Sequence, residues 1–130
     1  MTVALCVDDS LGRLFGGRRQ SRDRVVTEDL LKEGGGRLWI LPFSQRLFEG
    51  REGVAVASSP SEEGVWFLED QPLKPLADRI DRMILYRWNR AYPADVFLDL
   101  TPEAAGLHLV KREELRGFSH ERITKEVYEK

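Results

Sequence analysis

The segment RMILYRW, residues 82–88, decides the fold class of this chain. At its centre is the apolar run Met83-Ile84-Leu85, which is typical of a strand buried on both faces in the middle of a sheet. Side chains alternate along a strand, so Tyr86 and Trp88 should face one side and Arg87 the other. The two aromatic residues then lie near the carboxyl end of a central strand, where ligands bind in open α/β sheets.

Similar apolar runs occur on both sides of this strand. Each is ended by turn residues, and together they predict strands at Thr2–Val7, Arg37–Leu41, Val54–Ala57, Val65–Leu68, Asp95–Leu98, Leu107–Lys111 and Ile123–Tyr128. Serine, proline and glycine predict a turn at Ser58–Gly64, and Gly12–Gln20 has no hydrophobic period and is expected to be a loop.

One helix of ordinary length is predicted after this loop. Ser21 is its expected N-cap, Gly34–Gly36 end it, and its inward stripe consists of Val26, Thr27, Leu30 and Leu31. Two brief helices are expected at Ser44–Phe48 and from Pro72 to about Arg79.

The order of these elements predicts an α/β fold. Helices and strands alternate in the first two thirds of the chain and strands alone complete it. This order favours a mostly parallel sheet with an antiparallel C-terminal edge and flanking helices, in a single compact domain over residues 1–130.

Composition narrows the class of protein. The 130 residues carry a formal charge of -2, with 42% hydrophobic and 32% charged residues, which excludes a disordered or fibrous chain. No apolar run approaches the length of a membrane-spanning helix, and the apolar run Met1–Val7 is too short for that of a signal peptide. A soluble, cytoplasmic protein is therefore expected. Cys6 is the only cysteine, which excludes an internal disulfide.

Several local strings resemble the dihydrofolate reductase family. The opening Ala4-Leu5-Cys6-Val7-Asp8 with Gly12 is similar to that family's first strand and the start of its mobile loop. The stretch Val65–Leu98 follows the family's order of strand, short helix, strand, turn and strand, and Glu126–Lys130 is similar to its closing strand. The resemblance implies a dihydrofolate reductase-like fold and, as an activity, an NADPH-dependent reductase acting on a pterin-like or other small heterocycle.

The chain departs from the family where a nicotinamide cofactor would bind. The family has a Gly-Gly pair just after the strand that corresponds to Val65–Leu68, because a Cβ atom there would block the approach of the cofactor pyrophosphate. Here the sequence reads Leu68-Glu69-Asp70, and two carboxylates would repel a pyrophosphate. The second phosphate motif is replaced by Pro42-Phe43-Ser44-Gln45. We therefore predict a lost or altered cofactor site and no cofactor, with NADPH kept as the alternative.

Asp23 and Tyr86 are the candidate catalytic residues. Asp23 aligns within one residue of the family's catalytic carboxylate, and its spacing places it on the face of Val26 and Leu30. An acid half buried beside apolar groups has a raised pKa and can relay a proton or hold a substrate nitrogen. The resemblance implies that Tyr86 supports it from the central strand. The alternative is a first-turn acid favoured by the helix dipole or paired with an arginine.

Arginines gather where the family has an apolar entrance to its pocket. Fifteen of the 20 basic residues are arginine, and Arg18, Arg19, Arg22 and Arg24 lie within one short stretch. Such a cluster can hold a phosphate or carboxylate. It can equally be a solvated surface paired with acids, whereas binding to nucleic acid is disfavoured by the net charge. The predicted ligand-binding residues are Asp8, Arg18, Arg19, Gln20, Arg22, Thr27, Arg87, Trp88 and Asn89.

Other chemistries find less support. His108 and His120 lie in separate elements without an acid-rich pattern, so no metal site is predicted and a zinc-dependent nuclease such as ribonuclease Z is not supported. Cys6, on a buried strand, is expected to be a core residue rather than a nucleophile. Ser10, Ser58 and Ser59 lack the glycines of a nucleophile elbow.

These observations favour one function over two others. The sequence predicts a protein that binds a small anionic ligand between the first loop and the central sheet. The first alternative is a divergent reductase with Asp23 and Tyr86 at its centre. The second is a nucleic-acid-associated protein that uses the arginine loop.

Overall fold

A computed structural model describes residues 1–61 and 63–130 of the chain. The turn predicted at Ser58–Gly64 includes Glu62, which lies outside the described residues. In chain order the elements are β1 (Thr2–Val7), β2 (Gly12–Phe15), β3 (Arg18–Arg19), α1 (Arg24–Gly34), β4 (Leu38–Ile40), the 3-10 helix η1 (Pro42–Phe48), β5 (Val54–Val56), β6 (Val65–Phe67), the 3-10 helix η2 (Lys74–Arg79), β7 (Arg82–Arg87), β8 (Val96–Phe97), β9 (His108–Leu115) and β10 (Ile123–Glu129).

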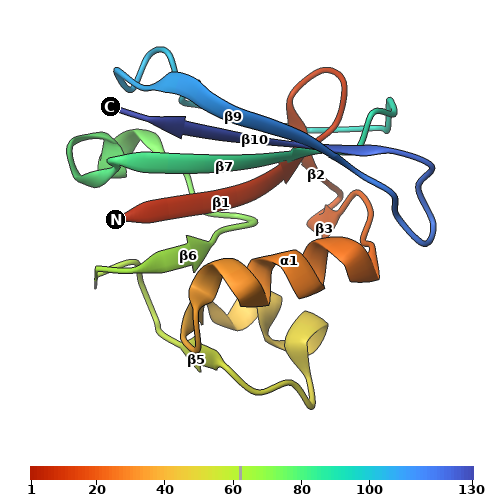
Figure 1. The fold of residues 1–130 in the computed structure, drawn as a ribbon, viewed down its shortest axis with the longest axis horizontal. Coiled ribbons are helices and arrows are strands. Elements are labelled where there is room, and N and C mark those ends of the chain that lie inside the picture. Colours follow the sequence, from red (N-terminus) through yellow and green to blue (C-terminus); the bar gives the residue numbers. More distant parts are fainter. Residues whose placement is uncertain (62) are drawn as a thin grey trace.

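The main sheet has the order β5-β4-β6-β1-β7-β10-β9 (Figure 1). Neighbouring strands from β5 to β7 are parallel, whereas β10 is antiparallel to both β7 and β9. The predicted mostly parallel sheet with an antiparallel C-terminal edge is therefore confirmed.

The predicted central strand is also correct. Met83 and Leu85 of β7 pack into the core on one face of the sheet, and Ile84, Tyr86 and Trp88 into the core on the other. β7 has a bonded neighbour at each edge and an apolar cluster against each face, so its backbone and both its faces are buried.

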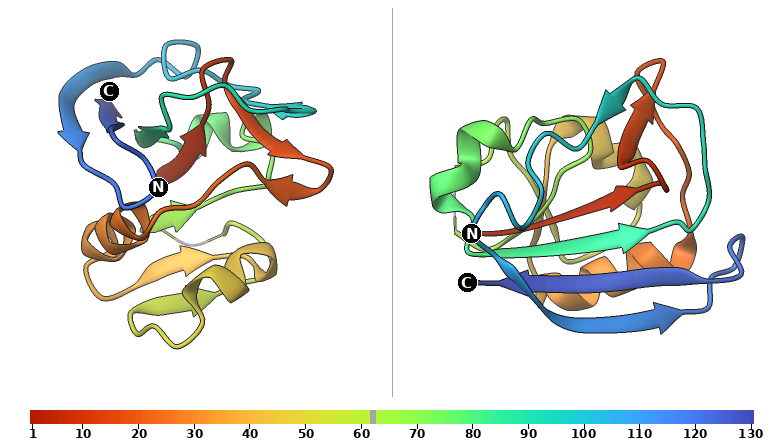
Figure 2. Two further views of the ribbon diagram at one scale, coloured as in Figure 1. Left: turned by 90° about the vertical axis from the view of Figure 1, so that its right-hand side faces the viewer. Right: turned by 90° about the horizontal axis from the view of Figure 1, so that it is seen from above.

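α1 covers one face of the sheet, over β4 and β6 (Figures 1 and 2). Its inward residues Val26, Thr27 and Leu30 are buried, as the spacing predicts. The helix ends at Gly34, and Gly35 follows in the left-handed conformation that glycine adopts at helix ends, with φ 57°. No helix among the described residues is long and apolar enough to span a membrane.

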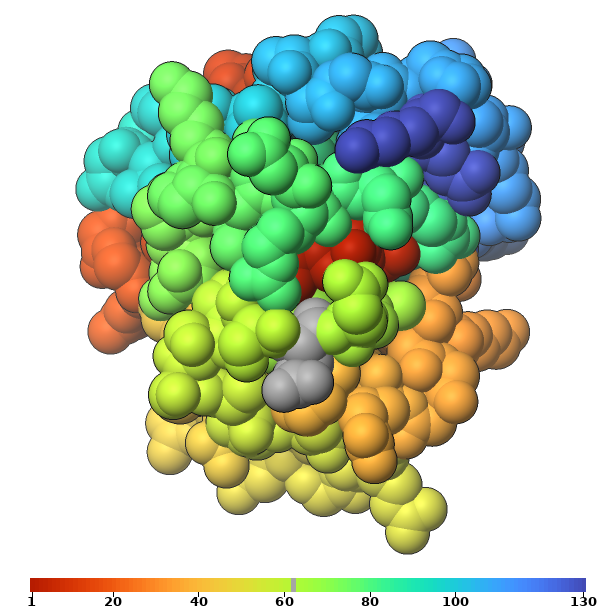
Figure 3. Space-filling view, turned by 90° about the vertical axis from the view of Figure 1, so that its left-hand side faces the viewer, coloured from red at the N-terminus to blue at the C-terminus, as the bar shows by residue number. Residues whose placement is uncertain are grey.

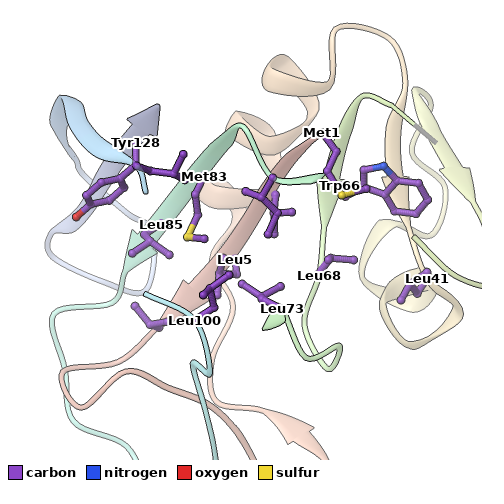
Figure 4. Close-up of a cluster of buried hydrophobic side chains, with 14 residues drawn as sticks. Met1, Leu5, Leu41, Trp66, Leu68, Leu73, Met83, Leu85, Leu100 and Tyr128 are labelled. Carbon is purple, nitrogen blue, oxygen red and sulfur yellow. The ribbon is translucent and has the colours of Figure 1, made fainter. Parts of the chain in front are cut away.

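A second apolar layer fills the opposite face of the sheet. Figure 4 shows Leu5, Met83 and Leu85 pointing toward Leu73 and Leu100, which come from the segments that cross this face. Trp66 stacks on Trp39 at 5.1 Å between ring centroids. The first strand is enclosed by this layer, and in Figure 3 its residues show only as a small red area between green segments. Met1 is accordingly 2% exposed, and its amino group donates to the carbonyl of Arg79.

The predicted Gly12–Gln20 loop is wrong in one respect, because β2 and β3 form a hairpin within it. Together with β8 they make a small antiparallel sheet of order β3-β2-β8. Gly16 and Gly17 supply the positive φ values of the hairpin turn, 59° and 74°. The hairpin buries Arg13 and Leu14, although the polar, glycine-rich sequence around them gave no sign of burial.

The predicted N-terminal caps of the helices are wrong as well. α1 is capped by Asp23 rather than Ser21, since the carboxylate of Asp23 accepts from the backbone N–H of Val25. The helix expected to start at Ser44 is the 3-10 helix η1, which begins at Pro42, and the Ser44 hydroxyl donates to Glu69 instead of capping it.

Candidate functional site

A narrow cavity of about 20 Å³ lies beneath α1, against the sheet. Its walls come from β1, β2, β3, β6 and α1, together with the segment that joins β3 to α1. The lining residues are Cys6, Arg13, Arg19, Gln20, Ser21, Arg22, Asp23, Val26, Thr27, Leu30, Leu47, Phe67, Glu69 and Trp88. A space of this size holds about one or two water molecules.

Two buried polar atoms of residues that line this cavity have no hydrogen-bond partner in the described part of the chain. They are Nε of Arg13 and Oε1 of Gln20. The remaining guanidinium nitrogens of Arg13 donate to the carbonyls of Gln71 at 2.7 Å and Leu68 at 2.9 Å, and the residue is 5% exposed. Burial lowers the pKa of Arg13, because desolvation penalises its charged form. Two of the lining residues therefore carry one unmatched donor and one unmatched acceptor.

Arg19 is engaged by an acid on the other side of the cavity. Its Nε and a terminal nitrogen donate to the two carboxylate oxygens of Glu69 at 2.7 and 2.8 Å. The Ser44 hydroxyl donates to the same carboxylate at 2.7 Å. The hydrogen bond to Glu69 raises the pKa of Arg19. Because this pair is bidentate and partly buried, its charges are largely neutralised by each other.

Asp23 differs from the sequence prediction in its protonation. It is buried, as expected, but its pKa is lowered rather than raised. Burial alone would raise the pKa, but hydrogen bonds from His120 and from backbone N–H groups outweigh it. The backbone donors are Val25, Phe118, Ser119 and His120 at 2.9 to 3.2 Å. Asp23 is thus a permanent carboxylate at neutral pH.

His120 joins Asp23 to Ser21. Its Nδ1 lies 3.0 Å from Oδ2 of Asp23, and its Nε2 lies 3.0 Å from the hydroxyl of Ser21 and 3.0 Å from that of Tyr92. The ring stacks on Trp88 with 4.5 Å between centroids. The β9–β10 loop, which carries His120, curves down to the N-terminal end of α1 in Figure 1.

Tyr86 does not support Asp23, so this prediction is wrong. Its hydroxyl donates to the Asp29 carboxylate at 2.6 Å, one side of a charge cluster that also holds Lys125 and Glu33. Burial and the neighbouring Asp29 carboxylate raise the pKa of the Tyr86 phenol. Tyr86 lies on the predicted strand, but its hydrogen bond is accepted by Asp29, nearly two helical turns beyond the expected acid.

The predicted ligand-binding residues divide into two groups. Arg19, Gln20, Arg22, Thr27 and Trp88 line the cavity together with Asp23. The structure therefore brings these residues into one place from β3, the β3–α1 segment, α1 and the end of β7.

The others lie elsewhere. The Asp8 carboxylate accepts from the backbone N–H groups of Gly12 and Tyr92 at 2.7 and 3.0 Å, and it holds the turn after β1. Burial would raise the pKa of Asp8, but these hydrogen bonds lower it. Arg87 pairs with Glu126 on the opposite face of the sheet. These two predicted residues do not line the cavity.

Arg18 and Asn89 also stand outside the cavity. Arg18 is exposed on the hairpin. Asn89 has a positive φ of 59°, and its side-chain amide donates to the Arg122 carbonyl and the Thr124 hydroxyl. Asparagine tolerates this backbone conformation, so Asn89 ends the β7 strand rather than binding a ligand in this cavity.

Sequence reasoning missed Arg13, Ser21, Glu69 and His120 as members of the site. Arg13 lies next to apolar Leu14 in a segment read as a loop, and no local pattern marks it, because adjacent strand residues face opposite sides and both of these are buried. The other three meet their partners across 50 or more residues, and no local spacing marks them.

The residues around the cavity give little support to metal binding or to a reactive thiol. Among residues 1–61 and 63–130, no group of three or more histidine, cysteine or acidic side chains is placed to hold a metal ion. Cys6 lines the cavity, but burial and the nearby Glu69 carboxylate raise the pKa of its thiol. A neutral thiol is a poor nucleophile.

The fold has a clear relative among solved structures. The chain is similar to the dihydrofolate reductase from Enterococcus faecalis complexed with NADP(H) and RAB-propyl, with a TM-score of 0.64 over 98% of this chain and 94% of that chain. Sequence identity is 14%, so the likeness establishes a dihydrofolate reductase-like fold and nothing about activity. No protein-family model and no curated protein matched the sequence.

Proposed function

We propose that this protein binds a small anionic molecule in the cavity beneath α1. The observation that carries the proposal is the pair of unmatched polar atoms, Arg13 Nε and Gln20 Oε1, in the wall of one cavity. A buried polar atom without a partner costs about 1–3 kcal/mol. A ligand that accepts from Arg13 and donates to Gln20 removes both costs.

The charges of the wall favour an anion. Arg19 is neutralised by Glu69, whereas the described contacts of the Arg13 guanidinium are to neutral carbonyl groups. Among the described residues no carboxylate is bonded directly to the Arg13 guanidinium, although those of Asp99, Asp70 and Glu69 lie near enough to favour its charge. A ligand carboxylate or phosphate would supply one, with a charge-assisted hydrogen bond to Nε.

Entry of such a ligand requires the wall to move. The cavity is smaller than a carboxylate-bearing metabolite, so in the segment Gln20–Arg22 the side chains of Gln20 and Arg22 must move aside on binding, while Ser21 stays beside His120. Arg22 is exposed at this segment, which makes it the part of the wall next to solvent. Arg22 would then meet the anion first.

An altered nicotinamide site accompanies this proposal. In the family that the sequence resembles, glycines occupy the positions of Glu69 and Asp70. The Glu69 side chain bonds both Arg19 and Ser44, and its carboxylate would face the pyrophosphate of a cofactor bound in the family's manner. These residues do not fit a dinucleotide, which argues against the alternative of an NADPH-dependent reductase.

The arginine stretch gives less support to nucleic acid as a partner. Arg19 is paired with Glu69, and Arg24 stacks over the Phe118 ring at 5.0 Å. Two of the four arginines are thereby engaged within the chain, and the net charge of -2 opposes a polyanion.

Calorimetry of the purified chain with acetate, oxalate, inorganic phosphate and NADPH tests the proposal. We expect at least one of the small anions to bind and to raise the melting temperature, and NADPH not to bind. Gln20→Met and Arg13→Lys should each weaken anion binding about tenfold, because each loses one bond worth about 1.4 kcal/mol.

Arg18→Met is the matched control, since Arg18 is an exposed arginine of the same hairpin and lies outside the cavity wall. It should bind the anion as the unmodified chain does. Equal weakening by all three substitutions would show that binding does not depend on the cavity wall, and would refute the site. Submillimolar binding of NADPH would restore the reductase alternative.

A further inference from the structure

Ser21, His120 and Asp23 stand in a chain of hydrogen bonds at the cavity wall. Oγ of Ser21 lies 3.0 Å from Nε2 of His120, and Nδ1 of His120 lies 3.0 Å from Oδ2 of Asp23. The side chains of His120 and Asp23 are 2% and 0% exposed, whereas Ser21 is only partly buried and lines the cavity. A hydroxyl, an imidazole and a carboxylate in this order are the parts of an activated serine nucleophile.

We infer that Ser21 is a nucleophile that cleaves small carboxylic esters, with His120 as its general base and Asp23 as the positioning residue. The inference rests on the proposed function, because the ester would occupy the same cavity.

The surroundings of Asp23 determine which imidazole nitrogen carries the proton. The carboxylate receives hydrogen bonds from four backbone N–H groups and the Ser119 hydroxyl, and it remains ionised. An ionised carboxylate only accepts, so Nδ1 of His120 must donate to it. In the neutral ring Nε2 then has a free lone pair that faces Ser21.

The ring is held in this orientation from two further sides. Trp88 stacks on it with an angle of 24° between the planes, and Tyr92 shares Nε2 with Ser21. Because one lone pair serves two hydroxyl groups, Tyr92 competes with Ser21 for the base. Tyr92 thus restrains the reactivity of Ser21.

The cavity also contains groups that suit the developing charge of an ester. The unmatched Nε–H of Arg13 is a donor for the oxygen of a tetrahedral intermediate, and the positive charge of Arg13 stabilises it further. The unmatched Gln20 Oε1 can accept from a hydroxyl of the alcohol portion. Both residues line the same cavity as Ser21.

The reaction needs only water as a second substrate. Oγ of Ser21 forms a bond to the acyl carbon while its proton passes to Nε2 of His120, and the carbonyl electrons become an oxyanion. The oxyanion collapses, the bond to the alkoxy oxygen breaks, and His120 returns the proton to the departing alcohol. Water, deprotonated by His120, then cleaves the acyl-serine in the same way and releases the carboxylic acid.

Labelling of the full chain with diisopropyl fluorophosphate, followed by peptide mass mapping, tests the inference, together with hydrolysis of p-nitrophenyl acetate. We expect one adduct, on Ser21, and ester hydrolysis that Ser21→Ala lowers by about 100-fold. Ser59→Ala, which removes an exposed serine outside the cavity, is the control and should leave both signals unchanged.

Tyr92→Phe provides a readout that a purely structural role of the network would not move. Removal of the competing hydroxyl should speed adduct formation at least twofold, whereas an unchanged or slower rate overturns the assignment of His120 as the base. Absence of an adduct on Ser21 in the folded protein, or ester hydrolysis that survives Ser21→Ala, overturns the esterase.

The two proposals can fail separately. Anion binding that depends on Arg13 and Gln20, without labelling of Ser21, refutes the esterase and keeps the proposed function. Labelling of Ser21 without anion binding refutes the proposed anion site and leaves the nucleophile in place.

Discussion

Oδ2 of Asp23 and Nδ1 of His120 lie 3.0 Å apart although 97 positions separate the two residues in the chain. This contact fastens the β9–β10 loop to the first turn of α1. The loop supplies three consecutive backbone N–H groups, from Phe118 to His120, to one carboxylate. One acid therefore caps the helix, anchors a distant loop and orients an imidazole.

Removal of the Asp23 carboxylate should destabilise the protein strongly. Asp23→Ala loses the helix cap and leaves several buried donors without an acceptor, so we expect a loss of about 2–4 kcal/mol in the free energy of unfolding. Urea denaturation followed by circular dichroism measures it. Asp9→Ala, at an exposed acid, is the control and should change stability by less than about 0.5 kcal/mol.

The same carboxylate predicts the direction of the acid response. Its pKa is lower in the folded protein than in the unfolded chain, so the unfolded chain binds more protons at acid pH. This contribution to stability is present above the unfolded value of about 3.9 and is lost as the pH falls toward the lower folded value. Unfolding measured from pH 6 to pH 2 should show less pH dependence for Asp23→Asn than for the unmodified chain. The same dependence of unfolding free energy on pH in both proteins would contradict the role of Asp23 in the acid response.

Gly117 allows the loop to approach Asp23. A Cβ atom at this position would lie 2.6 Å from Oδ2 of Asp23 and 2.7 Å from the His120 carbonyl oxygen. Gly117→Ala must push the loop away and should cost about 1–3 kcal/mol. Gly16→Asn, where the added side chain meets open space and asparagine tolerates the positive φ, should cost less than about 1 kcal/mol. Thermal unfolding of both variants distinguishes them, and similar losses would refute the close approach.

Tyr86 should matter for stability and not for the cavity. Tyr86→Phe removes the hydroxyl that donates to Asp29, which keeps Lys125 as a partner, so we expect a loss of about 1 kcal/mol. Anion binding and labelling of Ser21 should be unchanged. A variant of full stability that no longer binds the anion would instead place Tyr86 in the site, as the resemblance to the reductase family implied.

Lys125 neutralises the acids beneath α1. Its Nζ lies 2.7 Å from Asp29 and 2.5 Å from Glu33, and its side chain is 4% exposed. Lys125→Met leaves Asp29 without its cation and Glu33 with the more distant Arg82 at 3.4 Å, and should cost about 3 kcal/mol. The exposed Lys111, paired with Glu113 at 3.6 Å, is the matched control, and Lys111→Met should cost less than about 0.5 kcal/mol.

Lys125 also predicts the response to alkali. Burial would lower the pKa of Lys125, but its hydrogen bonds to the two acids raise it in the folded protein. Its contribution is fully present below the unfolded value of about 10.4 and is lost as the pH rises through the folded value. Unfolding between pH 9 and pH 11.5 should therefore show a loss of stability that Lys125→Met lacks. An identical alkaline profile in both proteins would contradict this.

The sequence was sufficient for the elements of the main sheet and the long helix. β1 and β7 are marked by apolar runs, and α1 by apolar residues at helical spacing with glycines after it, since these signals arise from neighbours in the chain. The order of the elements then restricted the topology to a mostly parallel sheet with an antiparallel edge.

Several candidate residues were also found from the sequence, but not their roles. Asp23 is buried at the start of the helix, as its spacing indicated, yet its pKa is lowered where a raised value was expected. The expectation weighed burial beside apolar residues. That expectation did not include the hydrogen-bond donors of the β9–β10 loop, because no residue spacing near Asp23 indicates that this loop lies beside it.

Local patterns in this chain thus determined where strands and helices form, because hydrophobic periodicity is a property of adjacent residues. Only the tertiary structure decided which polar groups meet: Arg19 with Glu69, Tyr86 with Asp29, and His120 with both Asp23 and Ser21. Such contacts depend on strand order and on the paths of loops to within about 1 Å, since a hydrogen bond weakens steeply outside a narrow range of distance and angle.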